Sequence, residues 1–471
     1  MGMTTVYRFR PMENLLNRYH ELENQELVLS SPRDFNDPIE GYQDVFWEGD
    51  EVLWENLLRH YLLNLLSAAN TCLIFDDDGF DDYAIQPELT RDSLPTDEYR
   101  ELFDSVCQSF FHERGFARVP SSLASLPEPL RRKSLQLVLS ALHFPALASV
   151  LDILRDSNII PETLFEVPNS ADPDTVLEIL DSLSAVMDDE DETQWLESMA
   201  SHVGSHKSHA FLQQALQTGA DELELHMKKK ILLFASFPGR YVREVCDSLI
   251  HPNWHTLCFA RECTNPSMWA TYADEHRGAA LMFRTDSQSD GAWSELNVNG
   301  RTGWQGSEPI FDQIQASLYA VDYESPPPQV NFFKFLGNLP RPTLESAWHS
   351  TADGETSPIV DEILEDEESW RDDLWDHFRS MTTTKLEQWE HEQEIRMVLP
   401  DLLDSEGPRR KVTFDLSQLA GVVFGLRTCL EDRFEVMRIL SESSQDGDSP
   451  PVEFYEMVFD GTSFRKVKLG V

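Results

Sequence analysis

Positive charge is scarce in this sequence. Its 471 residues include 38 Lys and Arg against 83 Asp and Glu, which leaves a formal net charge of -45 at pH 7. A surface of that sign repels polyanions, so bulk binding of nucleic acid or of an acidic membrane through net charge is disfavoured. A local basic patch is still compatible with this composition. An acidic, lysine-poor surface is also typical of salt-adapted proteins, and the sequence does not separate the two explanations.

Cysteines and long apolar runs are few as well. The six cysteines are scattered without the spacing of a disulfide framework, which is typical of reduced thiols in a cytoplasmic compartment. The chain begins MGMTTVYRFRP, without the apolar core of a signal peptide, and no stretch approaches about 18 uninterrupted apolar residues. We therefore expect a cytoplasmic protein with no membrane partner.

The familiar catalytic signatures are missing. The sequence contains no H-E-x-x-H zinc helix, no G-x-S-x-G turn, no P-loop and no G-x-G-x-x-G. His255, Cys258 and Cys263 resemble half of a zinc site, but no second pair has matching spacing. We therefore assign no metal ligands, and most well-known hydrolase and NTPase classes are unsupported.

The hydrophobic patterns predict an α+β fold with a mixed or antiparallel β core. Residues 4–45 have a strand, helix, strand pattern, residues 48–230 carry long amphipathic helical patterns, and strand patterns return near 256. The expected domains are an N-terminal part of the core (1–47), a large α-helical insertion (48–230) and the remainder of the core (231–471), with an acidic helix over 359–380. Asp460-Gly461 between two alternating segments predicts a C-terminal β-hairpin.

Charged residues alternate in the segment EQEIRMVL. If this segment is a strand, its apolar residues point to one face, and Glu392, Glu394 and Arg396 point to the other. The simplest interpretation is a solvated strand face with a weak Arg–Glu pair. The alternative is that two carboxylates and a guanidinium line a site.

A helix is predicted over 266–277, between the N-cap Asn265 and the terminating Gly278. Helical spacing gives this segment one stripe, formed by Trp269, Tyr272, Ala273 and His276. Such a stripe is more often core packing than a platform for a ligand.

Motifs spread along the chain occur in a fixed order: VYRFR with ELVLSSPRDFNDPIEG, LCFARECTNPSMWATYADEHRGAALMF, KLEQWEHEQEIRMV and VVFGLR. Together they resemble the motifs of a bacterial protein family catalogued as domain of unknown function 2971. The resemblance covers about 1–45, 250–340 and 380–471 and leaves 48–230 unexplained. The sequence departs from the family pattern at Arg8 (Lys in the family), Ile39 (Phe) and Ala260 (Ser). The matching positions are Arg10, Ser31, Pro32, Phe35, Asn36, Asp37, Pro38, Glu40, Cys258, Phe259, Met268, Trp269, Tyr272, Ala273, His276, Gly278, Lys385, Trp389, Glu392, Glu394 and Arg396.

The order of these elements is also similar to that of ADP-ribosyltransferase-like domains, which split NAD at the nicotinamide–ribose bond. The resemblance implies an NAD-dependent transferase acting on an unknown acceptor (a protein, a nucleic acid or a small molecule), in toxin or phage-defence biology. Its implied catalytic residues are Glu394, Glu392 and Ser31. The implied NAD-binding residues are Arg8, Arg10, Asn36, Asp37, Glu40, Trp269, Tyr272, His276, Lys385 and Arg396.

Two alternatives stay open at this point. The same cleft could serve a non-catalytic module that senses a nucleotide or another ligand, with the helical block binding a partner. A metal-dependent hydrolase or nuclease could instead use clustered carboxylates around a divalent ion, with Asp37, Glu40, Glu392 and Glu394 as its ligands. Within SSPRDFNDPIEG, Asn36 and Asp37 are typical turn formers, and Ser31 and Glu40 are the ends expected to meet a ligand.

Overall fold

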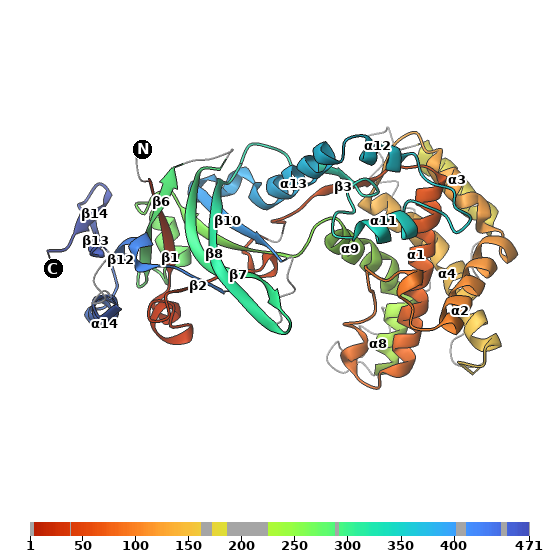
Figure 1. Cartoon of the computed structure of the whole chain (residues 1–471), viewed down its shortest axis with the longest axis horizontal. Coiled ribbons are helices and arrows are strands. Elements are labelled where there is room, and N and C mark those ends of the chain that lie inside the picture. Colours follow the sequence, from red (N-terminus) through yellow and green to blue (C-terminus); the bar gives the residue numbers. More distant parts are fainter. Residues whose placement is uncertain are drawn as a thin grey trace. The chain divides into compact units, whose positions relative to one another are not determined.

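The chain forms two compact units in a computed structural model that describes residues 4–37, 39–161, 172–185, 225–287, 292–401, 411–443 and 450–470 (Figure 1). Unit 1 comprises Met1–Tyr42, Asn253–Pro328 and Phe378–Val471. Unit 2 comprises Gln43–Pro252 and Gln329–His377. The predicted α+β class is confirmed, because a large sheet forms unit 1 and helices form most of unit 2.

Six antiparallel strands of unit 1 close into a barrel. Their hydrogen-bonded order is β6-β1-β5-β10-β8-β7, and pairing between β7 and β6 completes the ring. The strands are β1 (Thr4–Arg10), β5 (Trp254–Ala260), β6 (Ala279–Ser287), β7 (Ser294–Gln305), β8 (Glu308–Ala320) and β10 (Glu394–Pro400). Strands far apart in the sequence are therefore neighbours, as with β10 and β5, which pair from Glu394↔Ala260 to Pro400↔Trp254.

The strand pattern of β10 explains which of its sides faces the apolar core. Ile395, Met397 and Leu399 are buried together with Leu257 and Phe259 of β5 in one hydrophobic cluster. Because side chains alternate along a strand, Glu394 and Arg396 lie on the opposite face. The predicted division of β10 into an apolar and a charged face is thus confirmed.

Five further strands extend the barrel sheet at its edges. The strands β12 (Leu419–Phe424), β13 (Glu453–Phe459) and β14 (Phe464–Lys468) follow β6, and β11 (Lys411–Thr413) and β2 (Glu26–Val28) follow β7. The antiparallel pair β13–β14 is the predicted C-terminal hairpin, turning at Gly461 with φ +95°. The helices of unit 1 include α10 (Pro266–Tyr272) and α14 (Leu430–Ser443).

Unit 2 is a helical unit with one small sheet. Its strands are β3 (Asp44–Trp47), β4 (Leu130–Arg131) and β9 (Gln329–Asn331). Its described helices are α1 (Glu51–Ile74), α2 (Asp97–Gln108), α3 (Val119–Ala124), α4 (Arg132–Asp156), α5 (Pro173–Ser184), α8 (Leu225–Ile231), α9 (Phe237–Leu249), α11 (Arg341–Ala347), α12 (Ile359–Glu365) and most of α13 (Glu367–Thr383). The α1 and α4 helices carry much of the core, which includes Trp54, Leu58, Leu142 and Leu147.

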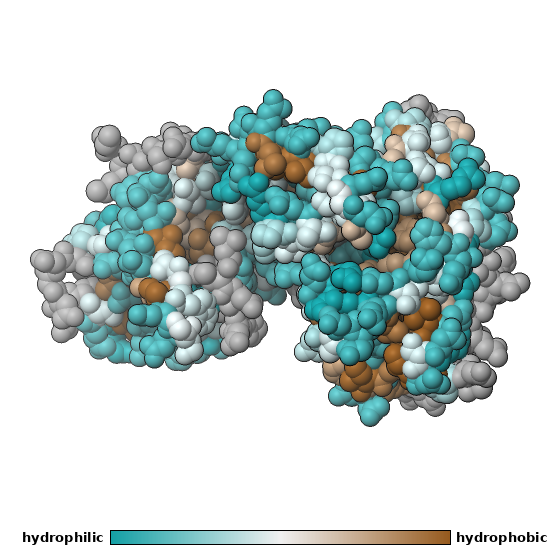
Figure 2. Space-filling view, turned by 45° about the vertical axis from the view of Figure 1, so that its right-hand side comes forward, coloured by the Kyte–Doolittle hydropathy of each residue, from teal (hydrophilic) through white to brown (hydrophobic). Residues whose placement is uncertain are grey.

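Helix α4 is the one described helix whose length and composition would allow it to cross a membrane. In the structure, 78% of its most apolar window is buried inside the protein. Helices buried in a protein core meet the same criteria of length and composition. The face of the molecule shown in Figure 2 is largely hydrophilic with smaller hydrophobic areas.

Several boundaries differ from those predicted. Residues 231–252 and 329–377, predicted to belong to the α+β core, lie in unit 2 because α9 and the segment 330–348 share its apolar core. The acidic helix over 359–380 is two helices, α12 and α13, divided at Asp366. Parts of the helical block (162–171 and 186–224) and the motif residue Pro38 lie outside the described residues.

The helix predicted over 266–277 is shorter than expected. It ends at Tyr272, and the next residues turn with left-handed backbone at Asp274, Glu275 and His276 (φ 46°, 50° and 73°). The sequence offers a good helix start at Asn265, whose side chain accepts a hydrogen bond from Ser267 N–H. The turn is instead determined by its packing against Gly425 and Arg427, which bond to the carbonyls of Gly278 and His276.

Candidate functional site

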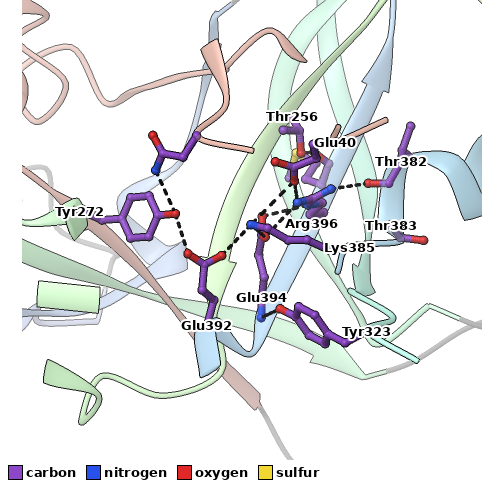
Figure 3. A network of polar contacts seen from close by, with 12 residues as sticks. Glu40, Thr256, Tyr272, Tyr323, Thr382, Thr383, Lys385, Glu392, Glu394 and Arg396 are labelled. Carbon is purple, nitrogen blue, oxygen red and sulfur yellow. Dashed lines mark hydrogen bonds and ion pairs between the residues drawn. The ribbon is translucent and has the colours of Figure 1, made fainter. Parts of the chain in front are cut away.

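Five buried charged side chains of unit 1 form one network, named here the charged cluster: Glu40, Lys385, Glu392, Glu394 and Arg396 (Figure 3). They come from three separate segments of the chain, namely the turn after Asp37, the segment that follows α13, and the start of β10. All five were predicted as site residues, and the structure brings all five together.

Lys385 is the centre of the charged cluster. Its ammonium Nζ donates to Glu392 Oε2 at 2.6 Å and to Glu394 Oε2 at 3.2 Å, and Glu40 Oε1 lies 3.9 Å away. The same ammonium lies 4.8 Å from the centre of the Trp389 ring. Lys385 has an exposed fraction of 8%. Its ammonium has charged or aromatic neighbours on several sides.

Arg396 is fully buried and holds two carboxylates. Its Nε and Nη2 donate to the two oxygens of Glu394 at 2.8 and 2.9 Å, and Nη2 also contacts Glu40. Its Nη1 donates to the carbonyl of Thr382 at 2.7 Å. The bidentate geometry is the strongest that an arginine offers a carboxylate, so Glu394 is held in one position.

A backbone turn at Gln393 allows the two glutamates beside it to reach the same lysine. Gln393 has left-handed backbone (φ 45°) and ends the short helix Glu387–Glu392. Glu392 therefore lies before the strand. The alternating pattern, in contrast, predicts that Glu392 lies on the charged face of the strand. The Glu394 N–H donates to the hydroxyl of Tyr323 at 2.9 Å, which anchors the first residue of β10.

Tyr272 and Asn36 extend the network from the Glu392 side. The Tyr272 hydroxyl donates to Glu392 Oε1 at 2.6 Å (Figure 3). Asn36 Nδ2 donates to the Tyr272 oxygen at 3.3 Å. Burial, followed by the carboxylate of Glu392, raises the pKa of Tyr272 above its ordinary value. Tyr272 is thus a neutral hydrogen-bond donor toward Glu392.

The charges of this region do not cancel. Asp37 is also buried, with 6% exposed, and its charge acts on Arg396. Its Oδ1 accepts from the Ile39 N–H, whereas its Oδ2 has no hydrogen-bond partner among the described residues. Four carboxylates (Asp37 and the three glutamates) thus face two cations. An excess of buried negative charge is costly unless protons or a cation offset it.

Proton affinities in the cluster follow from burial and from these charges. Burial raises the pKa of Glu394, although Lys385 opposes the shift. Burial alone would lower the pKa of Lys385, but the carboxylates of Glu394 and Glu392 outweigh it, and the net shift is upward. Lys385 is therefore a held cation between Glu392 and Glu394.

A small pocket opens beside Glu392. Its volume is about 130 Å³, and it is lined by Glu262, Thr264, Asn265, Met268, His391, Glu392 and Gln393. None of these residues is a lysine or an arginine. Glu392 thus belongs both to the charged cluster and to the lining of this pocket.

Other predicted site residues have different roles in the structure. Arg8 is buried and donates to the Val28 carbonyl at 2.7 Å, and Arg10 forms an ion pair with the buried Glu21. Ser31 begins a helical turn in which its carbonyl accepts from the Asp34 N–H at 2.9 Å. Each arginine therefore has a partner within the fold, and the assignment of both to a ligand stays a prediction.

Trp269 and His276 belong to a packed region on the outer face of β1. Trp269 is fully buried, its ring lies edge-on to Phe9 at 5.0 Å, and its Nε1–H donates to the Cys263 carbonyl. His276 stacks on Trp269 with ring centres 6.5 Å apart. Trp269 therefore packs within the fold, as is common for such a stripe, and its assignment to NAD stays a prediction.

The neighbours of the charged cluster that were not predicted as site residues include Cys258, Tyr323 and Thr382. Cys258 is the cross-strand partner of Arg396, and burial, followed by the charge of Glu394, raises the pKa of its thiol. Knowing that β10 pairs with β5 would have identified Cys258. Tyr323 and Thr382 contribute through one hydroxyl and one carbonyl, for which the sequence carries no signal.

Among the described residues, no three His, Cys, Asp or Glu side chains are arranged to hold a metal ion. The divalent-ion hydrolase hypothesis thus gains no support from the carboxylates, which are paired with Lys385 and Arg396 instead. Comparisons of the chain with protein-family models, with curated proteins and with solved structures find no match.

Proposed function

We propose that unit 1 is a ligand-binding, sensing module that takes a small cationic group, such as a primary ammonium, at Glu392. The observation that carries the proposal is the position of Glu392, which belongs both to the charged cluster and to the wall of a pocket without lysine or arginine. A cation there would also offset the excess of buried carboxylates.

The hydrogen-bonding capacity of the pocket supports a donor-rich ligand. Glu392 accepts one hydrogen bond at each oxygen, from Tyr272 and from Lys385, so each oxygen retains a further lone pair. Glu262 adds a second carboxylate to the lining. A volume of about 130 Å³ corresponds to roughly four water molecules, which suits a cationic head group.

Calorimetric titration with ethylammonium and guanidinium, compared with neutral acetamide and anionic acetate, tests the proposal. We expect saturable binding of a cation and none of the neutral or anionic probes. Glu392→Gln should weaken the binding about tenfold or more, the usual worth of a charged hydrogen bond. Glu390→Gln, an exposed glutamate of the same helix, is the matched control. Equal binding by acetamide, or by Glu392→Gln, would refute the assignment.

The sequence resemblance also implied an NAD-dependent ADP-ribosyltransferase-like enzyme, and one observation favours it: Glu392, Glu394 and Tyr272 join one network. The residues expected to hold NAD do not fit it, however. Arg10 is paired with Glu21, Trp269 is fully buried, and the small acidic pocket suits neither the size nor the phosphates of a dinucleotide. Incubation with NAD should therefore release no nicotinamide; release that Glu392→Gln abolishes would favour the transferase.

A further inference from the structure

A second cavity, of about 600 Å³, lies in unit 2. Its walls come from α1, α2, the loop around residues 89–92, the segment 111–120 and the segment 346–352. The volume lies within the range of about 300–1,000 Å³ that is typical of small-molecule sites. None of the sequence motifs includes its residues.

The lining combines an apolar part with convergent polar groups. Leu63, Leu89, Phe103 and Phe111 supply aliphatic and aromatic surface. Sites for organic ligands usually have this composition, in which apolar walls hold the body of the ligand and a few polar groups orient it.

Arg59 lines this cavity, and some of its N–H groups have no oxygen acceptor among the described residues. Its Nε donates to Glu55 Oε1 at 2.7 Å, and its guanidinium lies over the Phe111 ring at 5.7 Å. Neither Nη atom has an oxygen acceptor among the described residues, although the Cys107 thiol lies beside it. Arg59 is thus oriented by one carboxylate and one ring while most of its N–H groups stay available.

Arg91 repeats this arrangement at the same cavity. Its Nε and Nη2 donate to the two oxygens of Asp104 at 2.8 and 2.7 Å. Its Nη1 forms an ion pair with Asp92 Oδ1 at 4.0 Å, a distance at which the N–H groups of Nη1 make no hydrogen bond to that oxygen. Two guanidinium groups, each held by a carboxylate on one side, therefore offer donors to one cavity lined by apolar surface.

Asn56 adds an amide to the lining of the cavity. Both N–H groups of its amide donate to backbone carbonyls, those of Trp348 at 2.9 Å and Ser350 at 3.0 Å. Its exposed fraction is 5%, and its Oδ1 accepts no hydrogen bond among the described residues. Because this oxygen belongs to a residue of the cavity lining, it is an acceptor for a ligand with an N–H or O–H group.

From this arrangement we propose that the cavity of unit 2 binds a small organic anion, a carboxylate or phosphate attached to an apolar body. The anionic group pairs with the free Nη donors of Arg59 and Arg91, and the body packs on Phe103 and Phe111. A cation is not the matching ligand, because all three carboxylates of the lining, Glu55, Asp92 and Asp104, are already paired with the two arginines. This site is independent of the one proposed at Glu392.

Titration of the full chain with 3-phenylpropanoate and with phenyl phosphate, followed by NMR or calorimetry, tests the proposal and distinguishes the two anions. The neutral 3-phenylpropan-1-ol and inorganic phosphate probe the charge and the apolar body separately. We expect one or both aryl anions to saturate the protein, with tighter binding than either control probe. No saturation by either aryl anion, or equal binding of the alcohol, would overturn the proposal.

Substitutions in the cavity lining test whether the anion binds there. Arg59→Gln should weaken binding about tenfold to a hundredfold, the range for a hydrogen bond to a charged group. Arg114→Gln is the matched control, because Arg114 has the same exposed fraction of 28%, pairs with Asp152 and lies outside the cavity lining. Ala352→Trp, at an exposed position of the lining, fills the cavity without disturbing the core and should abolish binding even if Arg59→Gln fails to fold. Unchanged affinity in Ala352→Trp would show that the anion binds elsewhere.

Discussion

The Glu394 carboxylate receives hydrogen bonds from two cations. Arg396 donates through Nε and Nη2 at 2.8 and 2.9 Å, and Lys385 donates at 3.2 Å. On a solvated strand face such pairs would contribute little to stability. Here all three side chains are buried, so each charge depends on its partners for the solvation that water would otherwise supply.

Glu394→Gln should therefore lower the free energy of unfolding by about 3 kcal/mol, the lower end of the range for removing one member of a buried ion pair. The amide would present an N–H₂ group to Arg396 or Lys385, which have only donors. Urea denaturation measures the change, and the exposed Glu390→Gln is the control. A loss below about 0.5 kcal/mol, as expected of a surface substitution, would mean that the cluster is solvated.

At the scale of elements, the turn between α10 and β6 decides where Tyr272 and His276 lie. Asp274, Glu275 and His276 all have a left-handed backbone conformation, which is unfavourable for residues other than glycine. They are held by hydrogen bonds from Gly278 N to the Ala273 carbonyl at 2.8 Å and from Arg427 N to the His276 carbonyl at 2.9 Å. The turn is thus stabilised by the segment that follows β12.

Gly278→Ala should destabilise this turn. A Cβ at that position would lie 2.2 Å from the Arg10 carbonyl oxygen, which is backbone and cannot rotate away. Overpacking of this kind costs about 3 kcal/mol, and differential scanning calorimetry would show a lowered melting temperature. Gly303→Ala is the control, since its nearest neighbour would be a side-chain atom at 3.9 Å. A melting temperature for Gly278→Ala as high as that of Gly303→Ala would contradict the close approach.

At the scale of the whole molecule, the acidic surface and the buried histidines of unit 2 make stability depend on pH. His143 is buried between Tyr61 and Leu233, with Nδ1 2.7 Å from the Tyr61 hydroxyl and Nε2 2.7 Å from the Leu233 carbonyl. Because a carbonyl only accepts, Nε2 carries the proton and Nδ1 accepts from Tyr61. Burial lowers the pKa of His143 from 6.5 to about 4, since a second proton would add an unpaired charge.

Stability should fall as the pH drops from 6.5 toward about 4, because in that pH range His143 is protonated in the unfolded state but not in the folded state. The lowered pKa corresponds to about 3 kcal/mol, present above pH 6.5 and lost as the pH falls through the folded pKa. In urea denaturation at several pH values, His143→Gln should show a smaller decrease than the parent chain. His112→Gln, at an exposed histidine, should follow the parent; a parallel course for His143→Gln would disprove the assignment.

Features that follow from local sequence patterns were predicted more accurately than features that depend on tertiary packing. Strand positions, the hairpin at Gly461 and the two faces of β10 follow from local patterns, and the structure agrees with them. The end of α10 and the unit boundaries could not be predicted, because they depend on packing with Gly425, Arg427 and the core of unit 2. For the site, the motifs identified all five members of the charged cluster, but they also pointed to Arg8, Arg10 and Trp269, which have partners within the fold.

The sequence by itself determined the acidic character of the protein, the α+β class and the alternation that separates Glu394 and Arg396 from the apolar side of β10. Only the tertiary structure decided that this charged side is buried and paired with Lys385 and with Glu40, which comes from the N-terminal part of the chain. The physical reason is that alternation depends on the geometry of a single strand. Whether a face meets water depends on what packs against it, and that is decided by pairing and packing between residues far apart in the chain.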